Sequence, residues 1–128
     1  MTDPTDSLEG LRRQLAEFAR ERDWEQFHSP KNLAMALIAE AAELVEHFQW
    51  LTETQSQQLD ADKRAAVRLE LADILIYLIR TADRLDIDLI TAARDKIALN
   101  EQRFPAARVR GMACRGSELD NRQEFDES

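Results

Sequence analysis

Two pairs of acidic residues stand in apolar stretches of this sequence, at a spacing that suits metal-assisted chemistry. Glu40 and Glu43 lie three positions apart in ALIAEAAELVEHFQW, and Glu70 and Asp73 repeat that spacing in RLELADILIYL. Residues three apart on an α-helix share one face, separated by about 4.5 Å along the axis. An unpaired carboxylate in apolar surroundings costs several kcal/mol or changes its pKa until it is neutral. These acids therefore require partners.

Divalent cations are the partners that the pattern favours, because no Lys or Arg lies four residues from any of the four acids. A helical hairpin can bring both pairs to one level, where four carboxylates repel one another unless cations intervene. Ligands that are all oxygens favour Mg²⁺, with Mn²⁺ as a substitute, over zinc or iron. Magnesium held in this way keeps positions for water and phosphates, which points to metal-assisted hydrolysis. The alternative is a set of solvated acids, the interpretation we keep for Glu46 and Glu53.

Four helices are expected to position these acids. Apolar residues recur at intervals of three and four, and Ser29-Pro30 separates the first helix from the second. The expected ranges are roughly 6–23, 31–51, 63–85 and 88–103. The second and third helices are apolar on more than one side, so they need more partners than one short chain supplies. We expect an all-α bundle that associates with further copies; a monomer whose other helices cover these sides is the alternative.

Length and charge narrow the classes of protein further. The 128 residues suit one domain, expected over residues 7–105, with a flexible N-terminus over 1–6 and a flexible tail over 106–128. The net charge of -8 argues against a nucleic-acid duplex or an anionic membrane as partner. No apolar run reaches the roughly 18 residues of a membrane span, and MTDPTDSLEG does not resemble a signal peptide. A single cysteine, Cys114, excludes an internal disulfide and suits the reducing cytoplasm.

Three segments carry a resemblance to a known family. RDWEQFHSPKNLAMALIAEAAELVEHFQW, ELADILIYLIRTADRLDIDL and KIALNEQRFP resemble the all-α nucleotide pyrophosphohydrolases of the MazG-like superfamily, and its dCTP pyrophosphatase branch above all. The likeness covers roughly residues 8–111. It implies a four-helix bundle and a homo-oligomer, with a tetramer favoured and a dimer as the alternative. It also implies cleavage of a nucleoside triphosphate between its α and β phosphates, which yields a monophosphate and pyrophosphate.

The same resemblance implies roles for ten side chains. The magnesium ligands and catalytic groups would be Glu40, Glu43, Glu70 and Asp73. The substrate-binding groups would be two indoles and an imidazole at the base, a phenol at the sugar, and a cation and an amide at the phosphates: Trp24, Trp50, His28, Tyr77, Lys96 and Asn100. The plain alternatives are core packing for the tryptophans, a hydroxyl at the edge of the bundle for Tyr77 and a surface position beside a turn for His28.

The expected function is therefore Mg²⁺-dependent hydrolysis of a nucleoside triphosphate, with dCTP or a modified dCTP as the substrate and clearing of the nucleotide pool as the purpose. Three alternatives stay open at this point. The chemistry can act on other nucleoside triphosphates, the bundle can bind nucleotides or metals without catalysis, or the chain can be a structural interaction protein. The polar connection before Lys63 looks shorter than in the dCTP branch, which leaves its effect on substrate choice open.

Overall fold

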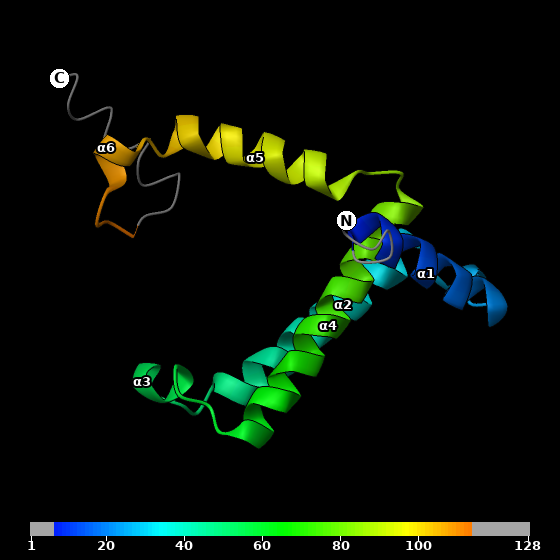
Figure 1. Cartoon of the computed structure of the whole chain (residues 1–128), viewed down its shortest axis with the longest axis horizontal. Coiled ribbons are helices and arrows are strands. Elements are labelled where there is room, and N and C mark those ends of the chain that lie inside the picture. The colour runs from blue at the N-terminus through cyan, green and yellow to red at the C-terminus, as the bar shows by residue number, and fades with distance from the viewer. Residues whose placement is uncertain (1–6, 114–128) are drawn as a thin grey trace. The chain divides into compact units, whose positions relative to one another are not determined.

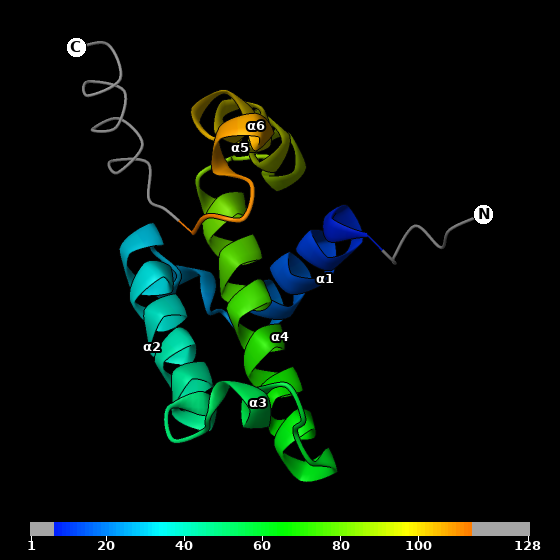
Figure 2. The same cartoon turned by 90° about the vertical axis from the view of Figure 1, so that its left-hand side faces the viewer.

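The computed structural model describes residues 7–113, which are helical and contain no strand (Figures 1 and 2). The elements in chain order are α1 (Leu8–Glu21), the 3₁₀ turn η1 (Glu25–Phe27), α2 (Pro30–Phe48), α3 (Glu53–Ser56), α4 (Ala61–Arg84), α5 (Leu89–Arg103) and α6 (Ala106–Val109). The four long helices expected from the sequence are confirmed, and each of their ends lies within one helical turn of its expected position.

The chain divides into two units, residues 1–87 and 88–128. Helices α1 to α4 belong to the first unit, and α5 and α6 belong to the second. A four-helix bundle, and one helical domain over 7–105, therefore remain predictions. The expected tail begins with the short helix α6, while residues 1–6, residues 114–128 and Cys114 lie outside the described range.

Side-chain caps set where the long helices begin. Each cap accepts a hydrogen bond from the backbone N–H three residues later, which satisfies one of the unpaired donors of the first turn. These caps are Ser7, Ser29, Asp60 and Asp88, at distances of 3.0, 3.1, 2.8 and 2.9 Å. Pro30 follows one of them at the first helical position, where a missing N–H costs no hydrogen bond.

The two helices that carry the acids form the centre of the first unit. Helices α2 and α4 run antiparallel and pack along each other, and α1 packs against α4 (Figure 2). Leu33 of α2 and Val67, Ile79 and Ala82 of α4 are buried, together with Ala19 of α1. The stretch between the hairpin helices holds α3, which begins with a reciprocal cap. The expected helical hairpin is confirmed.

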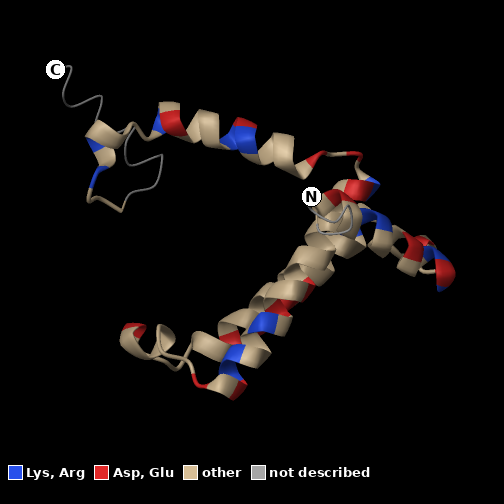
Figure 3. Cartoon of the chain, in the orientation of Figure 1, with Lys and Arg blue, Asp and Glu red and all other residues tan. Residues whose placement is uncertain are grey.

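Much of the apolar surface of this hairpin stays exposed. On α2, Met35, Ile38 and Val45 are 59%, 65% and 59% exposed, and on α4 Leu69 is 61% exposed. Charged residues are few in the middle of α4 and are concentrated towards its two ends (Figure 3). The excess of apolar surface noted in the sequence is thus present in the folded chain. No helix among the described residues combines the length and the apolar character needed to cross a bilayer.

Candidate functional site

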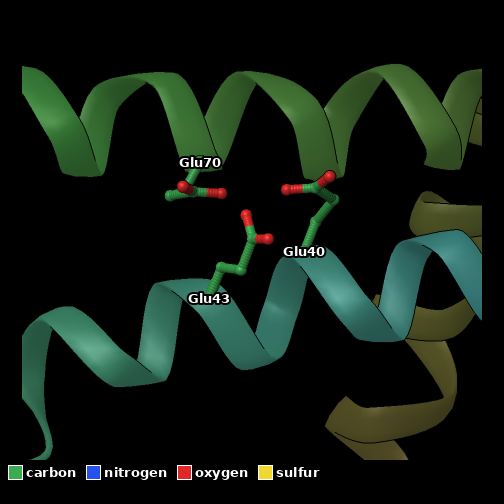
Figure 4. Close-up of side chains that lie close together, drawn as sticks. All are labelled: Glu40, Glu43 and Glu70. Carbon is green, nitrogen blue, oxygen red and sulfur yellow. The ribbon is translucent and has the colours of Figure 1, made fainter.

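Three of the four predicted acids meet between α2 and α4. Glu40 and Glu43 come from α2 and Glu70 comes from α4, and one oxygen of each lies within 4.8 Å of the others. Figure 4 shows the three carboxylates pointing into the space between the two helices. Asp73 is half-buried one turn beyond Glu70 but does not belong to this close group. Its predicted role as a ligand remains a prediction.

Burial and crowding disfavour the charged form of Glu40. Loss of hydration is the largest cause, and hydrogen bonding of the protonated acid to Glu70 and Glu43 adds to it. The negative charges of Glu43 and Asp73 act in the same direction, and together these effects raise the pKa of Glu40 to about 7. With a pKa of about 7, this carboxyl group is still partly protonated at neutral pH, and a bound cation would take the place of that proton.

Two oxygens of the cluster have no hydrogen-bond partner. Oε2 of Glu40 and Oε2 of Glu70 are both buried, and neither is hydrogen-bonded to any described residue. Buried polar atoms in native proteins nearly always have partners, so these two oxygens are suited to bind a ligand. The donors are all carboxylate oxygens, the set that Mg²⁺ and Mn²⁺ prefer. The residues present therefore fit a divalent cation.

The predicted base-site residues are only partly brought together. The Trp24 indole lies near the His28 ring, with 6.4 Å between ring centroids, and meets the edge of Phe18 at 5.7 Å. Trp24 is 44% exposed, so a flat ligand can still reach it. Trp50 lies just beyond the end of α2 and is 86% exposed, which argues against core packing within this chain. No ring contact joins Trp50 to the other aromatic side chains in the described part of the chain.

The remaining predicted residues lie on two different units. Tyr77 is half-buried on α4, one turn beyond Asp73, and its backbone carbonyl accepts a hydrogen bond from Thr81 at 2.7 Å. Lys96 and Asn100 are exposed on α5, one turn apart. Because α5 belongs to the second unit, the contact of these two residues with phosphates stays a prediction.

The sequence that carries the acid cluster is shared with a known protein family. Residues 36–119 match the family model described as the MazG-like family. The chain belongs to the MazG-like family. The resemblance stated from the sequence is thereby confirmed, and the all-α fold expected from it is the fold observed.

Relatives of this MazG-like chain share most of its length. It is 48% identical over 118 residues to dCTP pyrophosphatase 1 of Mus musculus, which covers 91% of this chain and 69% of the mouse protein. Identity to dCTP pyrophosphatase 1 of Homo sapiens is 46% over 118 residues, with the same coverage of 91% and 69%. Among solved structures, a pyrophosphatase from Archaeoglobus fulgidus is similar, with a TM-score of 0.74 and 35% identity. That match covers 82% of this chain and 98% of the archaeal one.

The structure of this MazG-like chain also reveals a buried network that the sequence analysis missed. Arg80 is only 3% exposed and donates to Asp83 at 3.1 Å, and Asp83 also accepts from Arg12 of α1 at 3.1 Å. Arg80 Nη2 lies 3.5 Å from Nδ1 of His28. Burial, and then the charges of Arg80 and Arg84, lower the pKa of His28. The network therefore ties α1 and the His28 segment to α4.

A second side chain of this MazG-like protein, His47, was also missed. It lies on α2 one turn after Glu43, and its Nε2 is 3.9 Å from Oε1 of Glu70. A spacing of four residues from Glu43 was the available signal, since residues four apart share a helix face.

Proposed function

We propose that this protein hydrolyses dCTP, or a modified dCTP, to the monophosphate and pyrophosphate. The observation that carries the proposal is the cluster of Glu40, Glu43 and Glu70, with its two buried and unpartnered oxygens. The relatives named dCTP pyrophosphatase 1 support the substrate and the reaction. The pyrophosphatase from Archaeoglobus fulgidus supports the reaction class on the same fold.

Glu40, Glu43 and Glu70 would hold the divalent cation, with Asp73 completing the set from the next turn of α4. A bound Mg²⁺ or Mn²⁺ supplies positive charge at the phosphates and lowers the pKa of a bound water. The chain's own carboxylates then have two tasks, which are to orient the attacking water and to accept its proton. The water oxygen bonds to the α phosphorus, and the bond from that phosphorus to the bridging oxygen breaks.

The substrate would be oriented by aromatic and polar groups around this cluster. We assign the base to Trp24 and His28, whose ring centroids lie 6.4 Å apart, and stacking on an aromatic ring is worth about 1–3 kcal/mol per base. We assign Trp50 to the base, Tyr77 to the sugar and the pair Lys96 and Asn100 to the phosphates, as the family resemblance implies. The positive charge of Lys96 would offset part of the negative charge of the acids and of the triphosphate.

Further parts of the proposal concern the setting of the reaction. We expect a homo-oligomer, a tetramer in preference to a dimer, that works in the cytoplasm and removes unwanted nucleotides. The exposed apolar residues of α2 and α4 support association between copies. The net charge of -8 supports a single nucleotide, held by cations, over a nucleic-acid duplex.

Release of pyrophosphate from a panel of nucleoside triphosphates, with and without Mg²⁺, tests the reaction directly. The wild type should release pyrophosphate from dCTP only when Mg²⁺ or Mn²⁺ is present. Glu43→Gln should lower kcat by at least about a hundredfold, because the variant loses a charged ligand of the cation. Glu46→Gln alters an exposed residue of the same helix and serves as the control.

Two results would contradict the proposal. Unchanged turnover of dCTP by Glu43→Gln at saturating Mg²⁺ would remove the acid cluster from the reaction. Binding of dCTP without any release of pyrophosphate would favour the alternative, a bundle that binds nucleotides without catalysis.

A further inference from the structure

We propose that His47 is a positioning residue that orients Glu70 in the cation site. This inference rests on the proposed function only in so far as the acid cluster binds a divalent cation. Its starting point is the contact between Nε2 of His47 and Oε1 of Glu70, at 3.9 Å. The two side chains are 24% and 18% exposed, so the contact is largely shielded from water.

The position of His47 on α2 explains why it reaches Glu70. His47 follows Glu43 by four residues, so both side chains project from the same face of the helix, towards α4. One oxygen of Glu43 lies within 4.8 Å of an oxygen of Glu70, and Nε2 of His47 lies 3.9 Å from Oε1 of Glu70 one turn further along α2. Side chains from two consecutive turns of α2 therefore lie close to Glu70.

The two oxygens of Glu70 have different surroundings. Oε1 faces the imidazole, whereas Oε2 is buried and has no hydrogen-bond partner among residues 7–113. A ring N–H directed at Oε1 restricts rotation of the carboxylate and leaves Oε2 available to a cation. Outer-sphere partners of metal ligands commonly act in this way, and their loss costs about 10- to 100-fold in metal affinity or activity.

The distance is compatible with a positioning role. At 3.9 Å the contact is longer than a hydrogen bond, but contacts in ligand-free sites often shorten when the ligand binds. A neutral imidazole with its proton on Nε2 is sufficient, so no change of charge is needed.

Direct ligation by His47 is the competing interpretation, and the geometry disfavours it. The group of side chains whose ligand atoms lie within 4.8 Å of one another contains the three glutamates and does not include His47. The imidazole therefore contacts one ligand from the side and does not share the space between all three.

Binding of Mn²⁺ alone, without nucleotide, tests the inference separately from catalysis. Calorimetry and electron paramagnetic resonance would compare the wild type with His47→Leu, which removes the donor, and His47→Gln, which keeps an N–H at similar reach. We expect His47→Leu to weaken Mn²⁺ binding by at least about tenfold. His47→Gln should recover most of the affinity, and Glu46→Gln should match the wild type. Circular dichroism would verify that each variant is folded.

Three outcomes would overturn the inference. Wild-type affinity for Mn²⁺ in folded His47→Leu would show that Glu70 needs no support from the ring. Coupling of bound Mn²⁺ to an imidazole nitrogen that is lost in His47→Leu would make His47 a ligand instead. A wild type that binds no Mn²⁺ would remove the site altogether. If His47→Leu weakens Mn²⁺ binding although the wild type releases no pyrophosphate from dCTP, the positioning role stands and the proposed reaction fails.

Discussion

Glu40 differs from an ordinary glutamate because its carboxyl group is partly buried beside other acids. Loss of hydration and the nearby negative charges raise its pKa from 4.5 to about 7. In the unfolded chain the same group is hydrated and away from these neighbours, so the shift belongs to the folded state alone. The free energy of unfolding and the affinity for a cation should therefore both change with pH, through the protonation of Glu40.

In the absence of divalent cations, the contribution of Glu40 to the free energy of unfolding should fall as the pH rises. Between pH 4.5 and about 7 the folded state binds a proton that the unfolded state has released, so the contribution is complete below 4.5 and is lost through about 7. Thermal unfolding in a chelator, compared between the wild type and Glu40→Gln, measures this difference directly.

Magnesium should oppose this loss of stability at higher pH, because the cation takes the place of the proton on Glu40. We expect Mg²⁺ to raise the Tm of the wild type more at about pH 8 than at about pH 5.5, since protons compete for the same oxygens at the lower pH. An equal Tm increase at both pH values would contradict a site that contains Glu40.

At the level of the helices, one ion network joins three segments. Asp83 of α4 accepts hydrogen bonds from Arg80 and from Arg12 of α1, and Arg80 also approaches His28. Because Arg80 is buried, its charge depends on Asp83 for compensation. The aromatic pair Trp24 and His28 lies in the segment between α1 and α2, so this network also holds the proposed base site against α4.

Asp83→Asn should destabilise the protein strongly, because it leaves the buried Arg80 charge without its anionic partner. We expect a loss of about 3 kcal/mol in the free energy of unfolding, at the lower end of values for broken buried pairs. Urea unfolding followed by circular dichroism would measure the loss.

Glu17→Gln provides the matched control, since it breaks an exposed ion pair with Arg20 one turn away on α1. Exposed pairs of this kind contribute about 1 kcal/mol or less. Equal losses in Asp83→Asn and Glu17→Gln would mean that the buried network adds no special stability.

For the molecule as a whole, the dominant feature is apolar surface that one chain leaves uncovered. Met35, Ile38 and Val45 lie on α2 at intervals of three and seven residues, so they form one exposed apolar stripe. Burial of such a stripe against another copy is favourable at about 25 cal/mol per Å². We therefore expect the stripe to lie in the contact between copies.

Ile38→Asp should shift the protein towards monomers, because a buried and unpaired carboxylate opposes association. Sedimentation velocity over a range of protein concentrations would show the shift, and circular dichroism would show whether the helices persist. Glu46→Gln should sediment like the wild type. A wild type that sediments as a monomer throughout would contradict the expected oligomer.

The helices and their ends were predictable because the signals are local. Ser29 and Asp88 cap the helices that follow them through N–H groups three residues away, and apolar periodicity of three to four marks the rest. The spacing of Glu40 and Glu43 is local in the same sense. A single turn of helix already places the two acids on one face, whatever surrounds it.

Distances between helices could not be obtained in that way, because they depend on packing between residues far apart in the chain. Packing of α2 on α4 brings Glu70 to Glu40 and Glu43 but leaves Asp73 outside the close group. It also creates the contact of His47 with Glu70, and the burial that changes the pKa of Glu40. Local spacing limits which face a side chain occupies, while the register and closeness of the opposing helix decide what that side chain meets.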